Sequence, residues 1–441
     1  MAQQAVSGVN KLCTRMKRRT DVFDFIYQTI GIVWLFMMLF TTRLFTVVKT
    51  AMLVFLVFVA VVEIIYKTIP IVRKHIRYVV AFAIFSFLSL VIGGISGFDF
   101  NMSSEFPLIQ YYIITPFCVL FLATVIGRSE RRKEFLWKAL IAMTALLAVL
   151  DVMKVGTAMI GMSLPFLGFI DLASATMTEE LAVRASNETS LLFLLPIILF
   201  LLLNEEKSAK KLVLYLISIG FGFVYAFISG RKILYIEIAL TIVYSLWYLK
   251  THKKIKNTPP NLRRGIKPLI IWGAILLVFG IVAYSDKIFG YISAAVGIDD
   301  IGRFAYDTVI NGLSSGAGGV TKRMGNIDAL MEMFYDSPIW GNGLNSYAAN
   351  SLACDTSKWS YEVSFIAWLA QTGIIGMMFL AVLAIYITKR LHRFGKRGDV
   401  RYDALMVGFL CFMLASASNP MIYLVWPWTI VDAYCIQTRY A

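Results

Sequence analysis

Histidine and cysteine are scarce in this chain, and their scarcity excludes several kinds of site. The three histidines, His75, His252 and His392, all lie in segments rich in Lys and Arg, where we expect them to be solvated. The five cysteines are scattered, without the spacing of a metal site or of a disulfide framework. The sequence therefore predicts no cofactor and no metal centre built from these side chains.

Charged residues are also few. They make up 16% of the 441 residues, whereas 59% are hydrophobic, which is more than a soluble domain needs for one core. Apolar runs long enough, or nearly long enough, to cross about 30 Å of hydrocarbon recur along the whole length. We predict a polytopic membrane protein with about twelve spans: 23–41, 45–66, 78–95, 108–126, 137–155, 189–203, 212–228, 233–249, 268–284, 363–387, 404–418 and 421–437.

These runs also lack the strict apolar–polar alternation of barrel strands. A segment within lipid must satisfy its own backbone hydrogen bonds, and runs this uniformly apolar do so as helices. The predicted fold is therefore all-α, with residues 1–441 forming a single polytopic membrane domain. No internal repeat with a period of about 20–50 residues is visible.

Lys and Arg are concentrated in alternate loops, and this pattern sets the expected orientation. The basic segments are the N-terminal tail, 67–77, 128–138, 207–211, 250–267 and 389–401, whereas the intervening loops carry Asp99, Glu105, Asp171, Glu179, Glu180, Asp299 and Asp300. The positive-inside rule then places both termini in the cytoplasm. We expect a multi-pass protein of the cytoplasmic (inner) membrane.

A formal net charge of +15 would also be compatible with nucleic-acid binding. The basic residues are, however, divided among loops on one face of a membrane, so topology and attraction to anionic lipid explain them better. We expect membrane lipid, and no nucleic acid, as a partner.

Two predicted external loops are long, 156–188 and 285–362, and long structured loops are usually functional. The second contains a helical pattern that begins near Thr321, a plausible N-cap, and ends at Pro338. Its apolar residues recur at helical spacing: Met324, Ile327, Leu330, Met331 and Phe334. We expect this amphipathic helix to lie on the outer membrane surface with its apolar face towards the lipid.

Three arginines lie on the predicted outer side, each beside the end of a helix: Arg184 in LAVRASNETSLL, Arg231 in FISGRKIL and Arg323 in the amphipathic helix. A single arginine there would be an ordinary snorkelling side chain. Three guanidinium groups can instead share a phosphate ligand through paired hydrogen bonds, and a lipid-linked pyrophosphate would present its charge at this depth. The residues alone leave both interpretations open.

Glu362 lies directly before the tenth predicted span, in SYEVSFIAWLAQTGIIG. It is either an interfacial carboxylate that marks the end of the loop or a base that takes a proton from a hydroxyl group. The charged residues inside the predicted spans likewise have two interpretations, local pairing or part of an ion or proton pathway. They are Lys49, Glu63, Glu237 and Asp432.

Four segments carry motifs. RASNETSLLFLLP at Arg184 and SGRK at Arg231 place an arginine beside a helix end. KRMGNIDALMEMFYDSPIWGNGLNSY has an arginine that opens a helix ending in Pro, an apolar pair and a Gly-x-Gly turn, and YEVSFIAWLAQTGIIG has Gly-x-x-Gly at Gly373 and Gly376. These segments resemble the O-antigen polymerase and O-antigen ligase superfamily of bacterial surface-polysaccharide assembly. The last two are the more specific, and the layout of the spans extends the likeness over most of the chain.

One position departs from the family pattern. Ligases of this superfamily carry a histidine and a small polar residue ahead of the Gly-x-x-Gly, and the spacing puts that position at Glu362, which is followed by Val363. A ligase would therefore lack its expected base. The departure favours a polymerase.

The resemblance implies a polysaccharide polymerase, a glycosyltransferase that extends a cell-envelope glycan such as capsule or lipopolysaccharide. It implies inverting, metal-independent transfer between undecaprenyl-pyrophosphate-linked oligosaccharides on the outer face of the membrane, and it allows a chain-length regulator as a partner. Arg184, Arg231 and Arg323 would bind the pyrophosphate, and Glu362 with Arg323 would be catalytic.

Two alternatives stay open. One is ligase-like transfer of a finished glycan to another acceptor. The other is a transporter or flippase for lipid-linked oligosaccharide, which would be expected to place charges and broken helices at the midplane of both halves. The concentration of unusual charges on the outer side favours catalysis there.

Overall fold

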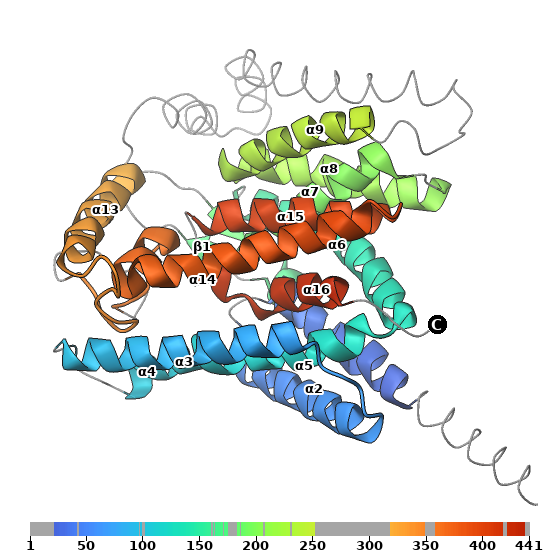
Figure 1. Ribbon diagram of the computed structural model, residues 1–441. Coiled ribbons are helices and arrows are strands. Elements are labelled where there is room, and N and C mark those ends of the chain that lie inside the picture. The colour runs from blue at the N-terminus through green and yellow to red at the C-terminus, as the bar shows by residue number, and fades with distance from the viewer. Residues whose placement is uncertain are drawn as a thin grey trace, which may run out of the picture. The chain divides into compact units, whose positions relative to one another are not determined.

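The computed structural model describes residues 22–41, 44–96, 98, 102–159, 162, 164–170, 172–174, 183–185, 187–205, 208–229, 232–251, 318–348, 358–417 and 421–436 (Figure 1). The first described helix is Val22–Phe40. It is followed by α2 Thr46–Tyr66, α3 Arg73–Ile95, α4 Met102–Ile109, a π-helical turn Gln110–Ile114, α5 Thr115–Gly127, α6 Glu130–Met159, a 3-10 turn Pro165–Leu167, strands β1 Leu172–Ser174 and β2 Val183–Ala185, α7 Glu188–Asn204, α8 Ala209–Ile228, α9 Lys232–Thr251, α13 Gly318–Asp336, α14 Ser364–Gly395, α15 Val400–Ser416, a 3-10 turn Met421–Tyr423 and α16 Val425–Cys435.

Eight of the described helices are long and apolar enough to cross a membrane, and each overlaps one of the predicted spans. The chain is therefore a helical multi-pass membrane protein, as predicted. Of the other four predicted spans, 189–203 and 404–418 correspond to α7 and α15, which have 17 residues each. The ninth, 268–284, lies outside the described residues.

The twelfth predicted span, 421–437, is too short in the structure. Its helix α16 has 11 residues, which at about 1.5 Å per residue is little more than half of a hydrocarbon core of about 30 Å. A 3-10 turn occupies Met421–Tyr423 and the backbone at Ile436 is extended, so the apolar run does not form one continuous helix.

One small sheet interrupts the predicted all-α fold. Strands β1 and β2 pair antiparallel, with Leu172 opposite Ala185 and Ser174 opposite Val183. Both lie within the predicted external loop 156–188. The middle of this loop is therefore paired with the segment just before α7.

The described chain divides into two compact units. The first contains residues 1–87, 106–143 and 424–441, and in it α5 packs against both α2 and α16. A side chain at Gly127 of α5 would meet the backbone carbonyl of Ala433 in α16. The two helices therefore approach closely because this position is glycine.

A buried ion-pair cluster joins three helices of the first unit. Arg132 of α6 donates hydrogen bonds to Asp24 at 2.7 Å and to Glu63 of α2 at 2.8 Å, and Lys67 also pairs with Glu63. The Arg132 guanidinium lies 4.4 Å from the centre of the Tyr27 ring. For Glu63, local pairing is therefore the interpretation that the structure confirms.

Asp432 of α16 is also paired, and its partner was expected to be solvated. Nδ1 of His75 lies 3.0 Å from a carboxylate oxygen of Asp432. Only 6% of His75 is exposed, so its prediction as a solvated loop residue was wrong. The flanking Lys and Arg residues suggested a loop, but His75 belongs to α3 and faces α16.

The second unit contains residues 88–105 and 144–423, with α7 at its centre. Every residue from Leu191 to Leu203 is buried, because α8, α9 and α15 all pack against α7. A helix that is apolar on all sides is expected to be buried in this way. Gly408 of α15 lets that helix approach Ile197, where a larger residue would clash.

Candidate functional site

The two segments with the most specific motifs lie together in the second unit. The first consists of α13 and the residues after it, up to Ala348, and the second of residues 358–363 and the start of α14. Helix α13 forms over Gly318–Asp336, close to the predicted bounds, and ends just before Pro338, which cannot continue it. We take this junction as the candidate site.

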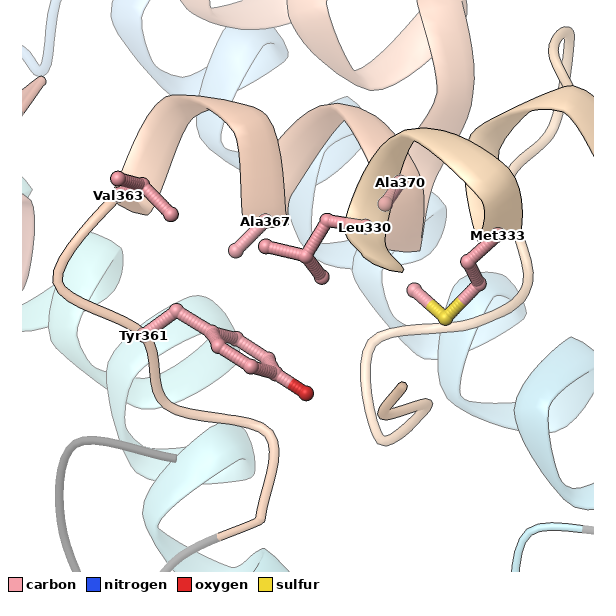
Figure 2. Close-up of a cluster of buried hydrophobic side chains, with 6 residues drawn as sticks. All are labelled: Leu330, Met333, Tyr361, Val363, Ala367 and Ala370. Atoms are coloured by element: carbon pink, nitrogen blue, oxygen red, sulfur yellow. The ribbon is translucent and has the colours of Figure 1, made fainter. Parts of the chain in front are cut away.

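The apolar face of α13 packs against α14 and the residues that precede it. Figure 2 shows Leu330 and Met333 of α13 facing Tyr361, Ala367 and Ala370, and all of them are buried in one cluster with Val363. The helix was expected to lay this face on the lipid, and that expectation was wrong. Tyr361 and the small residues of α14 supply a protein surface that covers it.

Gly373 breaks α14 where the sequence predicts one continuous span. Its φ of 64° and ψ of −168° are not helical, so the N–H groups that follow lose their partners within the helix. The turn after α13 supplies replacements. Ile374 donates to the carbonyl of Pro338 at 2.9 Å, and Ile375 donates to that of Ile339 at 3.2 Å.

The Gly-x-Gly turn also packs against the break in α14. Gly343 donates to the carbonyl of Gln371 at 2.8 Å. A side chain at Gly341, whose φ is 73°, would meet the backbone of Gln371 and Thr372. A side chain at Gly373 would in turn meet the backbone of Ile339. Both glycines are required by positive φ and by the close approach of two backbones.

A further glycine that the sequence analysis missed completes the junction. A side chain at Gly343 would meet the backbone of Gly93 in α3, and one at Gly93 would meet the side-chain amide of Asn345. Asn345 is 3% exposed, and its amide makes no hydrogen bond with the described residues. The pair Gly93–Gly94 near the end of an apolar run was the available signal, because small residues in membrane helices mark close contacts.

Polar side chains brace the loop on both sides of the glycines. Asn342 donates to the carbonyl of Met333 at 2.6 Å, which ties the turn to the end of α13. Gln371 donates to the carbonyls of Ser346 at 3.0 Å and Trp359 at 2.9 Å. The Tyr361 hydroxyl accepts from the amide of Ala348 at 3.0 Å. The junction therefore holds both ends of the loop before α14.

Glu362 lies at this junction, directly before α14, as predicted. It is half-buried between Tyr361 and Val363, which are both buried, and its backbone carbonyl accepts from Ser364 at 3.0 Å. The backbone at Glu362 is therefore held between two buried neighbours and bonded to the start of α14. Its role as a base stays a prediction.

The three arginines are placed only in part. The backbone of Arg323 lies in α13, and that of Arg184 lies in β2 opposite Ala173, but both side chains are outside the described residues. Arg231 lies outside them entirely. The shared pyrophosphate site therefore stays a prediction. Within the described part of the chain, no group of His, Cys, Asp and Glu could hold a metal ion.

Neither a protein-family model nor a curated protein matches this chain. The likeness to polysaccharide polymerases and ligases therefore depends on the motifs themselves. The two most specific motifs are the two that the junction brings into contact.

Proposed function

We propose that this protein is a polymerase of bacterial surface polysaccharide. It would transfer glycan between undecaprenyl-pyrophosphate-linked repeat units on the outer face of the cytoplasmic membrane. The observation that supports this proposal is the junction of the Gly-x-Gly turn with the break at Gly373, because it joins the two motifs that carry the resemblance. It also places Glu362 and the helix of Arg323 in one part of the molecule.

The proposed reaction is an inverting displacement. A hydroxyl oxygen of the acceptor sugar bonds to the anomeric carbon of the donor glycan, while the bond from that carbon to the phosphate oxygen breaks. Undecaprenyl pyrophosphate leaves with the electron pair, and the guanidinium groups of Arg184, Arg231 and Arg323 neutralise its charge. The hydroxyl proton passes to the carboxylate of Glu362.

The proposal includes the finer features of the topology. The nine predicted segments that cross the membrane before α13, with the N-terminus in the cytoplasm, put α13 and Glu362 on the outer side. The lipid-linked donor would then present its pyrophosphate at the level of this junction. The distribution of Lys and Arg supports this orientation.

The test is an assay of the purified protein in vesicles with lipid-linked repeat units. We expect a ladder of glycan products, and we expect Arg323→Ala and Glu362→Gln each to lower the initial rate by about 10²-fold or more. Lys322→Ala and Glu332→Gln are matched controls, because they change a neighbouring cation and an exposed acid on α13. Both controls should keep the ladder.

Three outcomes would contradict parts of the proposal. Movement of the lipid-linked unit across the bilayer without chain growth would indicate a flippase. Transfer of a finished glycan to a different acceptor, without a ladder, would indicate a ligase. Full activity of Glu362→Gln would show that Glu362 does not act as the base. This outcome is chemically possible, because a pyrophosphate leaving group does not strictly require a base.

A further inference from the structure

Exposed apolar side chains lie at the end of α13 and in the turn that follows it. Tyr335 is 71% exposed, Ile339 57% and Trp340 55%, although they adjoin the buried face of the same helix. Large apolar side chains grouped on a surface mark a contact with another apolar phase or partner. The candidate mechanism uses none of these three residues.

Backbone hydrogen bonds fix the position of this turn along α14. The carbonyls of Pro338 and Ile339 accept from Ile374 and Ile375, the first residues after the break at Gly373. From Ile374 to Thr388 the helix is uninterrupted and apolar, which at about 1.5 Å per residue covers about 22 Å of a hydrocarbon core of about 30 Å, and basic residues follow from Lys389. The turn therefore lies at the end of the membrane-crossing part of α14.

The turn is also continuous with the lipid-facing side of α14. Exposed apolar residues recur along that helix at spacings of three and four, which places them on one face. They are Ile374, Met378, Val382 and Ile385. Since the backbone of Ile374 is bonded to the turn, the exposed residues Ile339 and Trp340 lie next to the N-terminal end of this stripe.

Acidic residues share the exposed side of α13 with Tyr335. Asp328, Glu332 and Asp336 are exposed and four residues apart, so they form an acidic stripe along the helix. Carboxylates are stable in water, whereas Trp and Tyr favour the boundary between lipid and water. Tyr335 lies three residues after Glu332 and therefore on the same side of the helix, so this side fits the boundary between lipid and water and not the hydrocarbon.

We propose that Tyr335, Ile339 and Trp340 form an interfacial anchor that rests in the lipid bilayer at the N-terminal end of the membrane-crossing part of α14. The anchor holds the junction, and Glu362 with it, at the membrane boundary. This inference depends on the surface of the protein and not on the proposed reaction. Its occupant is bilayer lipid, because the patch continues a surface that already faces lipid.

Spin labels on introduced cysteines test the anchor. The five native cysteines are replaced, and Ile339→Cys is labelled in vesicles of phosphatidylethanolamine and phosphatidylglycerol. Ile374→Cys serves as the lipid-facing reference and Glu332→Cys as the water-facing one. We expect the ratio of oxygen to aqueous nickel-complex collisions at position 339 to resemble that at 374 and to exceed that at 332 several-fold.

Two results would overturn the inference. A ratio at 339 equal to that at 332 would place the turn in water. Protection of the label from both collision partners would mean that protein, such as a second copy of the chain, covers the patch. Because neither result depends on glycan transfer, the anchor and the proposed function can fail separately.

Discussion

Arg132 in the first unit and Gly341 in the second each join segments that are far apart in the sequence, but by opposite means. Arg132 joins helices through charge, with hydrogen bonds to two buried carboxylates. Gly341 joins a turn to α14 through the absence of a side chain, which lets two backbones meet. A charge cluster tolerates changes of shape but not of charge, whereas a glycine contact tolerates no added atom.

The largest effect is expected from breaking the charge cluster. Arg132→Met leaves Asp24 and Glu63 buried with less compensation, so we expect the free energy of unfolding to fall by about 3–5 kcal/mol. The measurement is thermal unfolding of the purified protein in detergent. Arg131→Met is the control, because Arg131 also lies 3.6 Å from Asp24 but its side chain is 67% exposed.

The control should change stability by less than about 1 kcal/mol, because an exposed ion pair is screened by solvent. If both substitutions lowered the free energy of unfolding equally, the burial of Arg132 would make no contribution to stability. The charge cluster would then not be what joins these helices.

The glycine junction should respond to a single added methyl group. Gly341→Ala introduces a side chain at a φ of 73° and against the backbone of Gln371, so we expect a loss of about 1–3 kcal/mol. Gly325→Ala, in open space within α13, should instead stabilise the protein by about 0.5–1 kcal/mol. The same unfolding measurement compares them, and shifts of the same sign would contradict the proposed contact.

The contact at Gly93 can be tested with a double-mutant cycle. Gly93→Ala should cost about 1–3 kcal/mol, because the added methyl group meets the side chain of Asn345 and no other atom as closely. Asn345→Ala in the same protein should restore most of that loss, since it removes the obstacle. Gly94→Ala, which has open space, is the control. Without rescue in the double mutant, strain at Gly93 would have another source.

The sequence predicted eight membrane helices well because their length and hydropathy are local properties, but it also predicted a span where α16 has only 11 residues. It also predicted α13, from apolar spacing and Pro338. It did not predict which surface the apolar face of α13 packs against, since lipid and the surface of Tyr361 and Ala367 are equally apolar. Nor did it show the pairing of His75 with Asp432, because such contacts depend on residues distant in the chain.

The candidate site was predictable in its position but not in its structure. Glycine spacing marked Gly341, Gly343 and Gly373 as special, yet a motif does not state which backbone each glycine approaches. Gly93 belongs to another helix and has no sequence relation to that motif. Its role became visible only when α3 and the turn were placed side by side.

The smallest effect is expected at Asp151, where the second unit buries a carboxyl group without an ion pair among the described residues. Asp151 of α6 is fully buried and faces Asn187, but neither side chain makes a hydrogen bond of good geometry with the described part of the chain. Asp151→Asn replaces the carboxyl group by an amide of the same shape, and a buried carboxyl group without a cation is neutral, so we expect stability to change by less than about 1 kcal/mol. Glu63→Gln, which weakens bonds to Arg132, should cost clearly more. If the two substitutions cost the same, Asp151 has a cationic partner beyond the described residues, and the second unit also depends on buried charge.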